Sequence, residues 1–194
     1  MKTSSCFHAT SCLPEEDRTL ISRLGQGPTV PVPYSLVHEA FENIAEAHPA
    51  TIAATAAGNS ITYQQLDEAA NRLANCLIHA GLKPRQRVCL VVQRSFEMLV
   101  GVFAILKAGC QYVPVDGGVA SNEALMHIFT DSDASFILCL PKFRERTEQF
   151  ARKDATVFAL SVDVGASFPS TRPLVQVSRQ DGAYAIYTSG KFVL

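Results

Sequence analysis

Residues 87–115 read RVCLVVQRSFEMLVGVFAILKAGCQYVPV, which is a strand, a helix and a second strand in direct succession. Residues 88–92 form a continuous apolar run, typical of a strand in a sheet that is buried on both faces. Residues 95–108 predict a helix that ends at Gly109, and residues 110–115 predict the next strand. A helix between two such strands favours a right-handed parallel crossover. The stretch therefore predicts an α/β fold with mostly parallel strands.

The alternation of helix and strand continues on the amino-terminal side of this stretch. Apolar residues repeat at helical spacing over residues 36–44, and Ser35 is a possible N-cap for that helix. Strands are predicted over residues 51–57 and 60–62, joined by a turn at residues 58–59. This part of the chain therefore adds a helix and a hairpin.

Thr62 and Gln65 fit a capping box, in which each side chain satisfies a backbone N–H group that the start of a helix leaves free. The helix that follows ends at Gly81. One face of it is apolar, and that face consists of Leu66, Ala69, Ala70, Leu73 and Leu77. We expect this face to pack on the sheet.

On the carboxyl-terminal side the same pattern predicts helices over residues 122–130 and 142–152. Strands are predicted over residues 135–140, 155–160 and 183–187. The helix over residues 142–152 mixes charges of both signs, which indicates a solvated face. Residues 1–33 contain several glycines and prolines, and we interpret them as a poorly ordered leader or linker.

The composition restricts the class of protein. Hydrophobic residues make up 47% and charged residues 18% of the 194 residues, which excludes a disordered chain. The formal net charge is -1, whereas proteins that bind nucleic acid carry a basic excess, so nucleic acid is not expected as a partner. The longest apolar run, residues 98–106, is far shorter than the ~20 residues of a membrane span. Residues 1–18 lack the apolar segment of a secretory signal.

The cysteines indicate a reducing compartment. The chain has six cysteines, none in a C-x-x-C pair, and three of them lie inside apolar runs, where a free thiol behaves as a small hydrophobe. We therefore predict a cytoplasmic protein. Cys6, His8 and Cys12 match no zinc-site spacing, so no metal site is predicted.

The loop after the last predicted strand is the candidate ligand site. Ligands of open parallel sheets bind on the loops beyond the carboxyl ends of the strands. Here the strand runs into Thr188, Ser189 and Gly190, and small residues of this kind let backbone N–H groups approach a phosphate. An ordinary Ser-Gly turn is the alternative interpretation of the same residues. A Walker A motif is excluded, because Ala185 and Phe192 occupy its glycine and Ser/Thr positions.

Three segments in order carry a resemblance to a known family. Residues 61–66 (ITYQQL), continued by residues 70–74 (ANRLA), are similar to the first core motif of adenylation domains of the nonribosomal-peptide-synthetase type, which are adenylate-forming (AMP-binding) enzymes. Residues 106–116 (LKAGCQYVPVD) match the second core motif. Residues 183–190 (AYAIYTSG) resemble the opening of the third, the phosphate loop. Residues 34–190 are thus identified as a partial adenylation domain, which is one part of the amino-terminal subdomain of that fold.

The resemblance implies an enzyme that joins an amino acid or another carboxylic acid to ATP, releasing pyrophosphate and leaving an acyl-adenylate. Thr188, Ser189 and Gly190 would be a remnant of the loop that holds the ATP phosphates. The groups that hold adenine, ribose, Mg²⁺ and the acid, and the catalytic lysine, belong to later motifs of the family. No catalytic residue is therefore assigned to this chain, and ATP and Mg²⁺ are not expected to bind it tightly.

The sequence departs from the family pattern at two places. Gly117 and Gly118 follow Asp116, where the family usually has proline. After Gly190, residues 191–194 replace the continuation of the phosphate loop, and we interpret them as an aberrant tail from a translated intron or a frameshift.

Three interpretations stay open. The chain is an inactive fragment of an adenylation domain, or an interaction module that binds an intact synthetase or a carrier protein, or a working ligase that further polypeptide completes. Residues 13–33 resemble the linker that precedes such domains in multimodular synthetases, which favours a carrier protein over coenzyme A as the acyl acceptor of the intact relative.

Several polar residues resemble catalytic groups only by type. Lys107, Tyr112 and Asp116 lie where a helix leads into a buried strand, so we interpret them as structural. Histidines and acidic residues that have no ligand or nucleophile spacing are expected on solvated or half-packed helix faces. These residues are His38, His48, His79, His127, Glu42, Glu46, Asp67 and Glu68.

Overall fold

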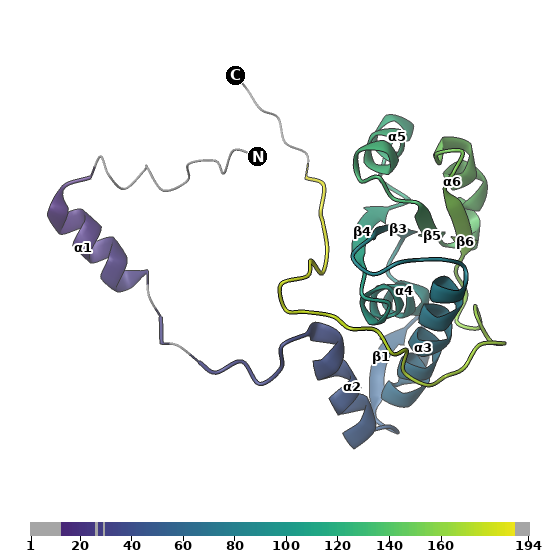
Figure 1. Cartoon of the computed structure of the whole chain (residues 1–194), viewed down its shortest axis with the longest axis horizontal. Coiled ribbons are helices and arrows are strands. Elements are labelled where there is room, and N and C mark those ends of the chain that lie inside the picture. The colour runs from purple at the N-terminus through teal and green to yellow at the C-terminus, as the bar shows by residue number, and fades with distance from the viewer. Residues whose placement is uncertain (1–12, 26, 29, 189–194) are drawn as a thin grey trace. The chain divides into compact units, whose positions relative to one another are not determined.

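The structure, a computed structural model, describes residues 13–25, 27–28 and 30–188, and the chain divides into two compact units, residues 1–33 and 34–194. The second unit is built on a four-stranded sheet with strand order β4-β3-β5-β6, in which each neighbouring pair is parallel (Figure 1). The strands are β3 (Arg87–Val92), β4 (Gln111–Asp116), β5 (Phe136–Cys139) and β6 (Thr156–Ala159). The predicted α/β fold with a parallel sheet is confirmed.

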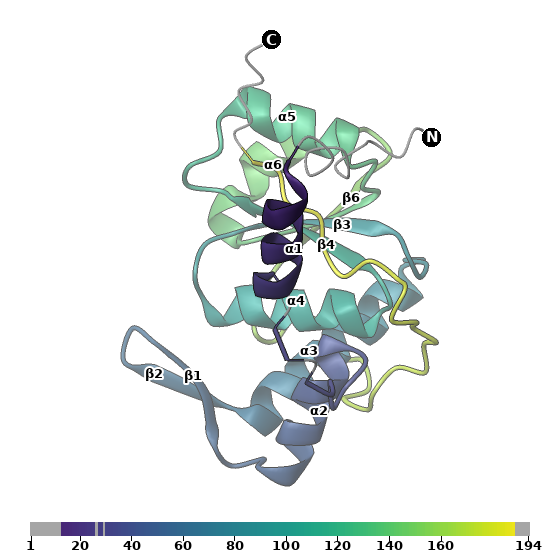
Figure 2. The same ribbon diagram turned by 90° about the vertical axis from the view of Figure 1, so that its left-hand side faces the viewer.

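Helices cover both faces of this sheet. Helices α3 (Tyr63–His79) and α4 (Phe96–Lys107) lie on one face, and α5 (Asn122–Asp131) and α6 (Arg144–Phe150) lie on the other (Figures 1 and 2). Alternate residues of a strand point to opposite faces, so Leu90 packs in the α3/α4 core while Cys89 and Val91 pack in the α5/α6 core. Both residues before and after Leu90 are therefore buried, which explains the continuous apolar run.

A third helix, α2 (Val37–Ala47), contacts α3 and α4. A short 3-10 helix, Pro141–Phe143, precedes α6. The prediction of Ser35 as the cap of α2 is wrong, because the N-cap is Leu36 and no side chain caps this helix. At α3 the predicted capping box is confirmed, since Thr62 Oγ1 accepts from Gln65 N and Gln65 Oε1 accepts from Thr62 N.

Strands β1 (Ile52–Ala56) and β2 (Asn59–Thr62) form the predicted antiparallel hairpin. Its turn is Ala57-Gly58 and not residues 58–59. Both turn residues have positive φ, 49° and 80°, as the two central positions of a type I′ turn require. The prediction was one residue late because alanine seldom adopts a positive φ, so Ala57 carries no turn signal.

The predicted strand over residues 183–187 is wrong. The structure has a single parallel bridge there, between Tyr112 of β4 and Tyr184. Tyr112 N donates to Ala183 O and Ala185 N donates to Tyr112 O, both at 3.1 Å. The next rung would need a backbone N–H group at position 114 of β4, and Pro114 has none. The ladder therefore stops after one rung.

Residues 161–182, which we call the strap, contain no helix and no strand. The strap connects β6, at one edge of the sheet, with the segment beside β4 at the other edge (Figure 1). Side chains of α3 hold its middle: Asn75 Nδ2 donates to Pro169 O at 2.9 Å and to Thr171 O at 3.0 Å, and Asn71 Nδ2 donates to Ser170 O at 2.9 Å.

The first unit contains helix α1 (Glu15–Leu24), in a region for which the sequence indicated only a leader. None of its residues is buried. The assignment of residues 1–33 as a leader or linker stays a prediction. Among the described residues, no helix combines the length and the apolar character that a membrane span needs.

Candidate functional site

The carboxyl edge of the parallel sheet gathers polar groups on the loops that follow β3, β4 and β5. After β4, Asp116 Oδ1 accepts a hydrogen bond from Gly118 N at 2.9 Å, which closes a tight turn. The ring of Phe143 packs directly on this turn, and a Cβ at Gly117 would lie 2.5 Å from that ring. A side chain at position 117 would therefore require the Phe143 ring to move.

Two cations of the 3-10 and α6 region lie at the same edge. Lys142 Nζ contacts Gln93 Oε1 and lies 5.0 Å from the centre of the Phe143 ring. Arg146 donates to the carbonyl of Gly117 at 3.1 Å, to that of Ala120 and to Asn122 Oδ1. The hydrogen-bond acceptors of both cations are neutral groups, although the Glu123 carboxylate also attracts the Arg146 guanidinium. Lys142 is therefore the cation at this edge that is better suited to attract an anion.

Residues 183–188 run parallel to β4 and therefore lead towards this carboxyl edge. The rings of Tyr112 and Tyr184 lie 5.7 Å apart, and Tyr187 donates its hydroxyl to Asp131 Oδ2. Burial, followed by that hydrogen bond, raises the pKa of Tyr187 to about 12, so this hydroxyl stays protonated at neutral pH. Thr188 is exposed.

The candidate phosphate loop is tested only in part by this geometry. Ser189 and Gly190 lie outside the described residues, as do residues 191–194 and the Cys6, His8 and Cys12 group. The assignment of Thr188, Ser189 and Gly190 to a phosphate loop therefore stays a prediction. What the structure contributes is the direction in which the chain approaches that loop.

Lys107 has a structural environment, as the sequence interpretation proposed. Its side chain is 1% exposed, and its Nζ contacts Glu42 Oε1 and lies 2.9 Å from Asp67 Oδ1. Glu42 Oε2 in turn lies 2.9 Å from Arg172 of the strap. Figure 1 places α2, α3 and α4, which carry the first three of these residues, next to one another. We call Lys107, Glu42, Asp67 and Arg172 the ion cluster.

The prediction that Glu42 and Asp67 lie on a solvated face is wrong. Their side chains are only 11% and 23% exposed, because both turn inwards to the ammonium group of Lys107. The signal in the sequence was Lys107 itself, a charged residue at the end of the apolar run 98–106. A buried lysine needs carboxylate partners, but the sequence does not say which acidic residues supply them.

His38 also departs from the expectation of a solvated or half-packed histidine, since it is 5% exposed. Burial, with Lys107 and Arg172 nearby, lowers its pKa from 6.5 to about 4. The imidazole is therefore neutral at pH 7. His48, His79 and His127 are exposed, as predicted.

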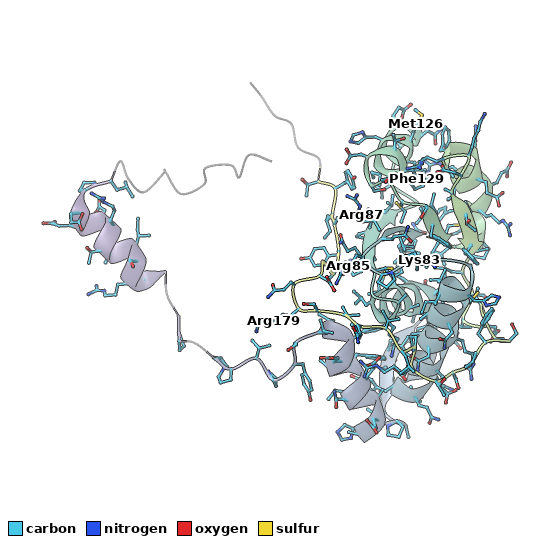
Figure 3. All side chains as sticks on the ribbon, in the orientation of Figure 1. Lys83, Arg85, Arg87, Met126, Phe129 and Arg179 are labelled. Atoms are coloured by element: carbon cyan, nitrogen blue, oxygen red, sulfur yellow. The ribbon has the colours of Figure 1, made fainter. Side chains whose placement is uncertain are left out.

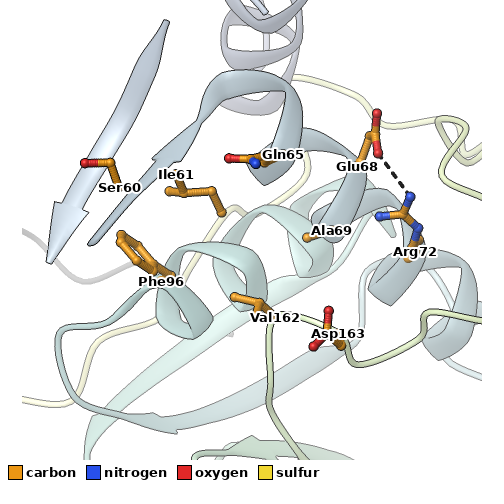
Figure 4. A pocket seen from close by; sticks show the side chains of 9 residues that line it. All are labelled: Ser60, Ile61, Gln65, Glu68, Ala69, Arg72, Phe96, Val162 and Asp163. Carbon is orange, nitrogen blue, oxygen red and sulfur yellow. Dashed lines mark hydrogen bonds and ion pairs between the residues drawn. The ribbon is translucent and has the colours of Figure 1, made fainter. Parts of the chain in front are cut away.

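A cavity of 340 Å³ opens between the hairpin, α3, the start of α4 and the strap (Figure 4). Ile61 and Phe96 provide apolar lining, and the ion pair of Arg72 with Glu68, at 3.0 Å, lies on one side. Ile61, Gln65 and Arg72 belong to the first core motif, but the sequence did not show that these residues line a cavity. Within the described part of the chain, no group of three or more histidine, cysteine, aspartate or glutamate side chains could hold a metal ion.

Comparisons with known proteins agree on one family. The family described as "AMP-binding enzyme" matches residues 41–190. Adenylate-forming reductase 06235 of Coprinopsis cinerea is 39% identical over 183 residues, which cover 93% of this chain and 18% of the reductase. Malpinin synthetase of Mortierella alpina is 38% identical over 184 residues, which cover 92% of this chain and 2% of that synthetase. The chain thus spans less than a fifth of these relatives.

Solved structures give the same result. The nonribosomal peptide synthetase FmoA3 matches 91% of this chain and 18% of its own, with 26% identity and a TM-score of 0.78. One structure of that synthetase is an AMPPNP-bound form. MatB of Rhodopseudomonas palustris matches 78% of this chain and 32% of its own, with 29% identity and a TM-score of 0.68.

Proposed function

Because the chain belongs to the AMP-binding enzyme family, we propose that residues 34–190 are the amino-terminal part of an adenylation domain. The intact domain would activate an amino acid or another carboxylic acid with ATP to an acyl-adenylate, in nonribosomal peptide or related secondary metabolism. The similarity to a nonribosomal peptide synthetase and to an adenylate-forming reductase supports this assignment.

The four free cysteines among the described residues support a reducing compartment, and we place the protein in the cytoplasm.

The single observation that carries the proposal is the parallel bridge between Tyr112 and Tyr184. It directs residues 183–188 towards the carboxyl edge of the sheet, which is where ligands of open parallel sheets bind. Lys142 and Arg146 lie at that edge, and their hydrogen-bond acceptors are neutral groups. In this proposal Thr188, Ser189 and Gly190 approach the ATP phosphates there.

The described residues fit only part of such a site. Thr188 supplies one exposed hydroxyl, and Lys142 and Arg146 supply positive charge at the carboxyl edge of the sheet. Among the described residues we assign no Mg²⁺ ligand. A preorganised set of donors around the reacting phosphorus is what accelerates this kind of reaction, and one hydroxyl does not supply it.

We therefore propose that the 194-residue chain by itself does not form an acyl-adenylate. The test is ATP–pyrophosphate exchange with the purified chain and a panel of amino and aryl acids, beside an intact adenylation enzyme as positive control. We expect exchange at the rate of the enzyme-free blank. Exchange that depends on one acid would contradict this proposal.

A second candidate function is an interaction module that binds an intact synthetase or a carrier protein. The observation in its favour is exposed apolar surface on the segment beside β4, where Tyr184 is 57% and Ile186 is 59% exposed. Apolar groups beside an open sheet edge favour association with another chain. The test is co-purification of the tagged chain with an intact synthetase. We expect Tyr184→Ser and Ile186→Ser together to abolish co-purification, whereas Val119→Ser, at another exposed apolar residue, should leave it intact.

A further inference from the structure

The strap ends in an ion pair that joins it to the sheet. Arg85 lies just before β3 and is labelled in Figure 3. Its Nε donates to Asp181 Oδ1 at 2.8 Å. Asp181 is the last residue but one of the strap, and its side chain is 14% exposed. The second carboxylate oxygen of Asp181 accepts a hydrogen bond from Ser178 N at 2.9 Å. The Asp181 carboxylate therefore accepts one hydrogen bond from within the strap and one from Arg85.

The backbone of Arg85 is specialised for this contact. Its φ is 68°, in the left-handed region that residues other than glycine seldom adopt. Arg85 N donates to Gly109 O at 2.7 Å, at the turn between α4 and β4. Arg85 is therefore fixed to the start of β4 through its main chain and to the strap through its side chain.

The residues immediately after Asp181 lie against the first residues of β4. A Cβ at Gly182 would lie 2.7 Å from the side-chain amide carbon of Gln111, so this end of the strap lies against the side chain of the first residue of β4. The next contact is the bridge of Ala183 and Ala185 to Tyr112. Pro114 prevents any further rung. The register of residues 183–188 on β4 therefore depends on this single bridge.

We propose that Arg85 and Asp181 are positioning residues for residues 183–188, the described segment that leads towards the candidate phosphate loop. Their ion pair holds the end of the strap where the single bridge at Tyr112 can form, and the bridge in turn fixes the position from which Thr188 leaves the sheet. The consequence for phosphate binding rests on the function proposed above, whereas the ion pair and the bridge need no nucleotide. Asn71 and Asn75 hold the strap about ten residues earlier and leave its last residues to Arg85.

The test is amide hydrogen exchange of the full chain without nucleotide, resolved at single residues by NMR. The reporters are the amides of Ala185 and Tyr112, which form the bridge, and the amide of Leu90 inside β3 serves as internal reference. In Arg85→Asn the ion pair is lost, while asparagine tolerates the positive φ better than arginine does. We expect the reporters to exchange about fivefold faster, which is the effect of losing about 1 kcal/mol of local stabilisation.

Two further variants make this test specific. Arg85→Lys keeps a cation opposite Asp181, so we expect it to restore most of the slow exchange. Arg179→Asn makes the same kind of substitution within the strap, two residues from Asp181. Arg179 is exposed and has no ion pair in the described part of the chain, so this variant should leave the reporters unchanged. Should Arg85→Asn not fold, Asp181→Asn removes the ion pair and keeps one oxygen for Ser178 N.

Unchanged exchange of Ala185 and Tyr112 in the ion-pair variant would overturn the proposal. An equal increase in the exchange rate of the Leu90 amide would also overturn the proposal. Such a result would mean that the ion pair stabilises the whole unit and does not position residues 183–188. Neither outcome depends on nucleotide chemistry. Failure of the proposed adenylation function is read instead from ATP–pyrophosphate exchange, so the two failures are distinguishable.

Discussion

Two buried regions of the second unit have opposite chemistry. The interior of the sheet is apolar: Leu90 and Leu138, on neighbouring strands β3 and β5, are fully buried among other hydrophobic side chains. The ion cluster lies at the end of α4, where Lys107 is as inaccessible as those leucines and is surrounded by carboxylates. Burial by itself therefore does not identify the interaction that stabilises a residue.

The two regions also differ in how the chain reaches them. The residues around Leu90 come from regular elements whose apolar pattern is continuous in sequence. The ion cluster takes one residue from each of α2, α3, α4 and the strap. Removing a member of the sheet interior leaves a cavity, whereas removing a member of the ion cluster leaves a charge without its partner. The predictions below separate these two effects.

The largest effect is expected in the sheet interior. Leu90→Ala removes a fully buried side chain, and the fixed strands on both sides limit collapse of the cavity. We expect the free energy of unfolding in urea to fall by about 4 kcal/mol. Val119→Ala, at a residue that is 81% exposed, serves as the control and should change it by less than about 0.5 kcal/mol. A loss below about 1 kcal/mol in Leu90→Ala would show that the sheet interior is not packed as described.

A somewhat smaller effect is expected for Lys107→Met in the ion cluster. Methionine fills a similar volume, but Glu42 and Asp67 lose their common cation while remaining largely buried. We expect a loss of about 3 kcal/mol, at the lower end of the range for buried pairs because Asp67 retains some contact with water. The matched control is the double variant Lys107→Met with Glu42→Gln, which removes both charges of the Lys107–Glu42 pair. This variant should recover part of the lost free energy of unfolding. If the double variant is less stable than Lys107→Met alone, the assignment of Glu42 as an ion-pair partner of Lys107 is wrong.

The smallest of the three effects is a pH dependence at His38, beside the ion cluster. Its folded-state pKa of about 4 lies below the ordinary value of 6.5, so unfolding takes up a proton at pH values between the two. The stability that His38 contributes is therefore complete above about pH 7 and should decrease by about 2 kcal/mol on acidification to pH 5.

The measurement is urea unfolding of wild type and His38→Gln at several pH values between about 7.5 and 5, since glutamine does not titrate in this range. The exposed histidines are common to both chains, so they cancel in the difference between the two stability curves. A difference that is the same at every pH would refute the neutral, buried state of His38.

Much of the fold was predictable because its signals are local. The capping box of Thr62 and Gln65 needs only residues three apart, and the apolar strand over residues 88–92 needs only its own length. The register between strands was not predictable in this way. Residues 183–187 have the composition of a strand, but Pro114 of β4 withholds the donor for the second rung. A partner distant in sequence decided that outcome.

The candidate site divides in the same manner. The sequence pointed to Thr188, Ser189 and Gly190, and their assignment to a phosphate loop remains a prediction. The sequence did not indicate that Lys142 and Arg146 lie at the carboxyl edge of the sheet. Charged residues of a mixed-charge helix are usually solvated, so they carry no signal for a site. The contact of Arg85 with Asp181 spans 96 positions, and no local pattern encodes it.

The amino-acid sequence by itself determined the order of helices and strands from α2 to β6, the parallel sheet buried on both faces and membership of an AMP-binding family. These properties follow from periodicity and motifs, which depend on neighbours along the chain. Only the tertiary structure determined which carboxylates surround Lys107 and that His38 is buried and neutral. It also determined the path of the strap to β4. Those outcomes depend on distances between elements, since electrostatic and packing energies act through space.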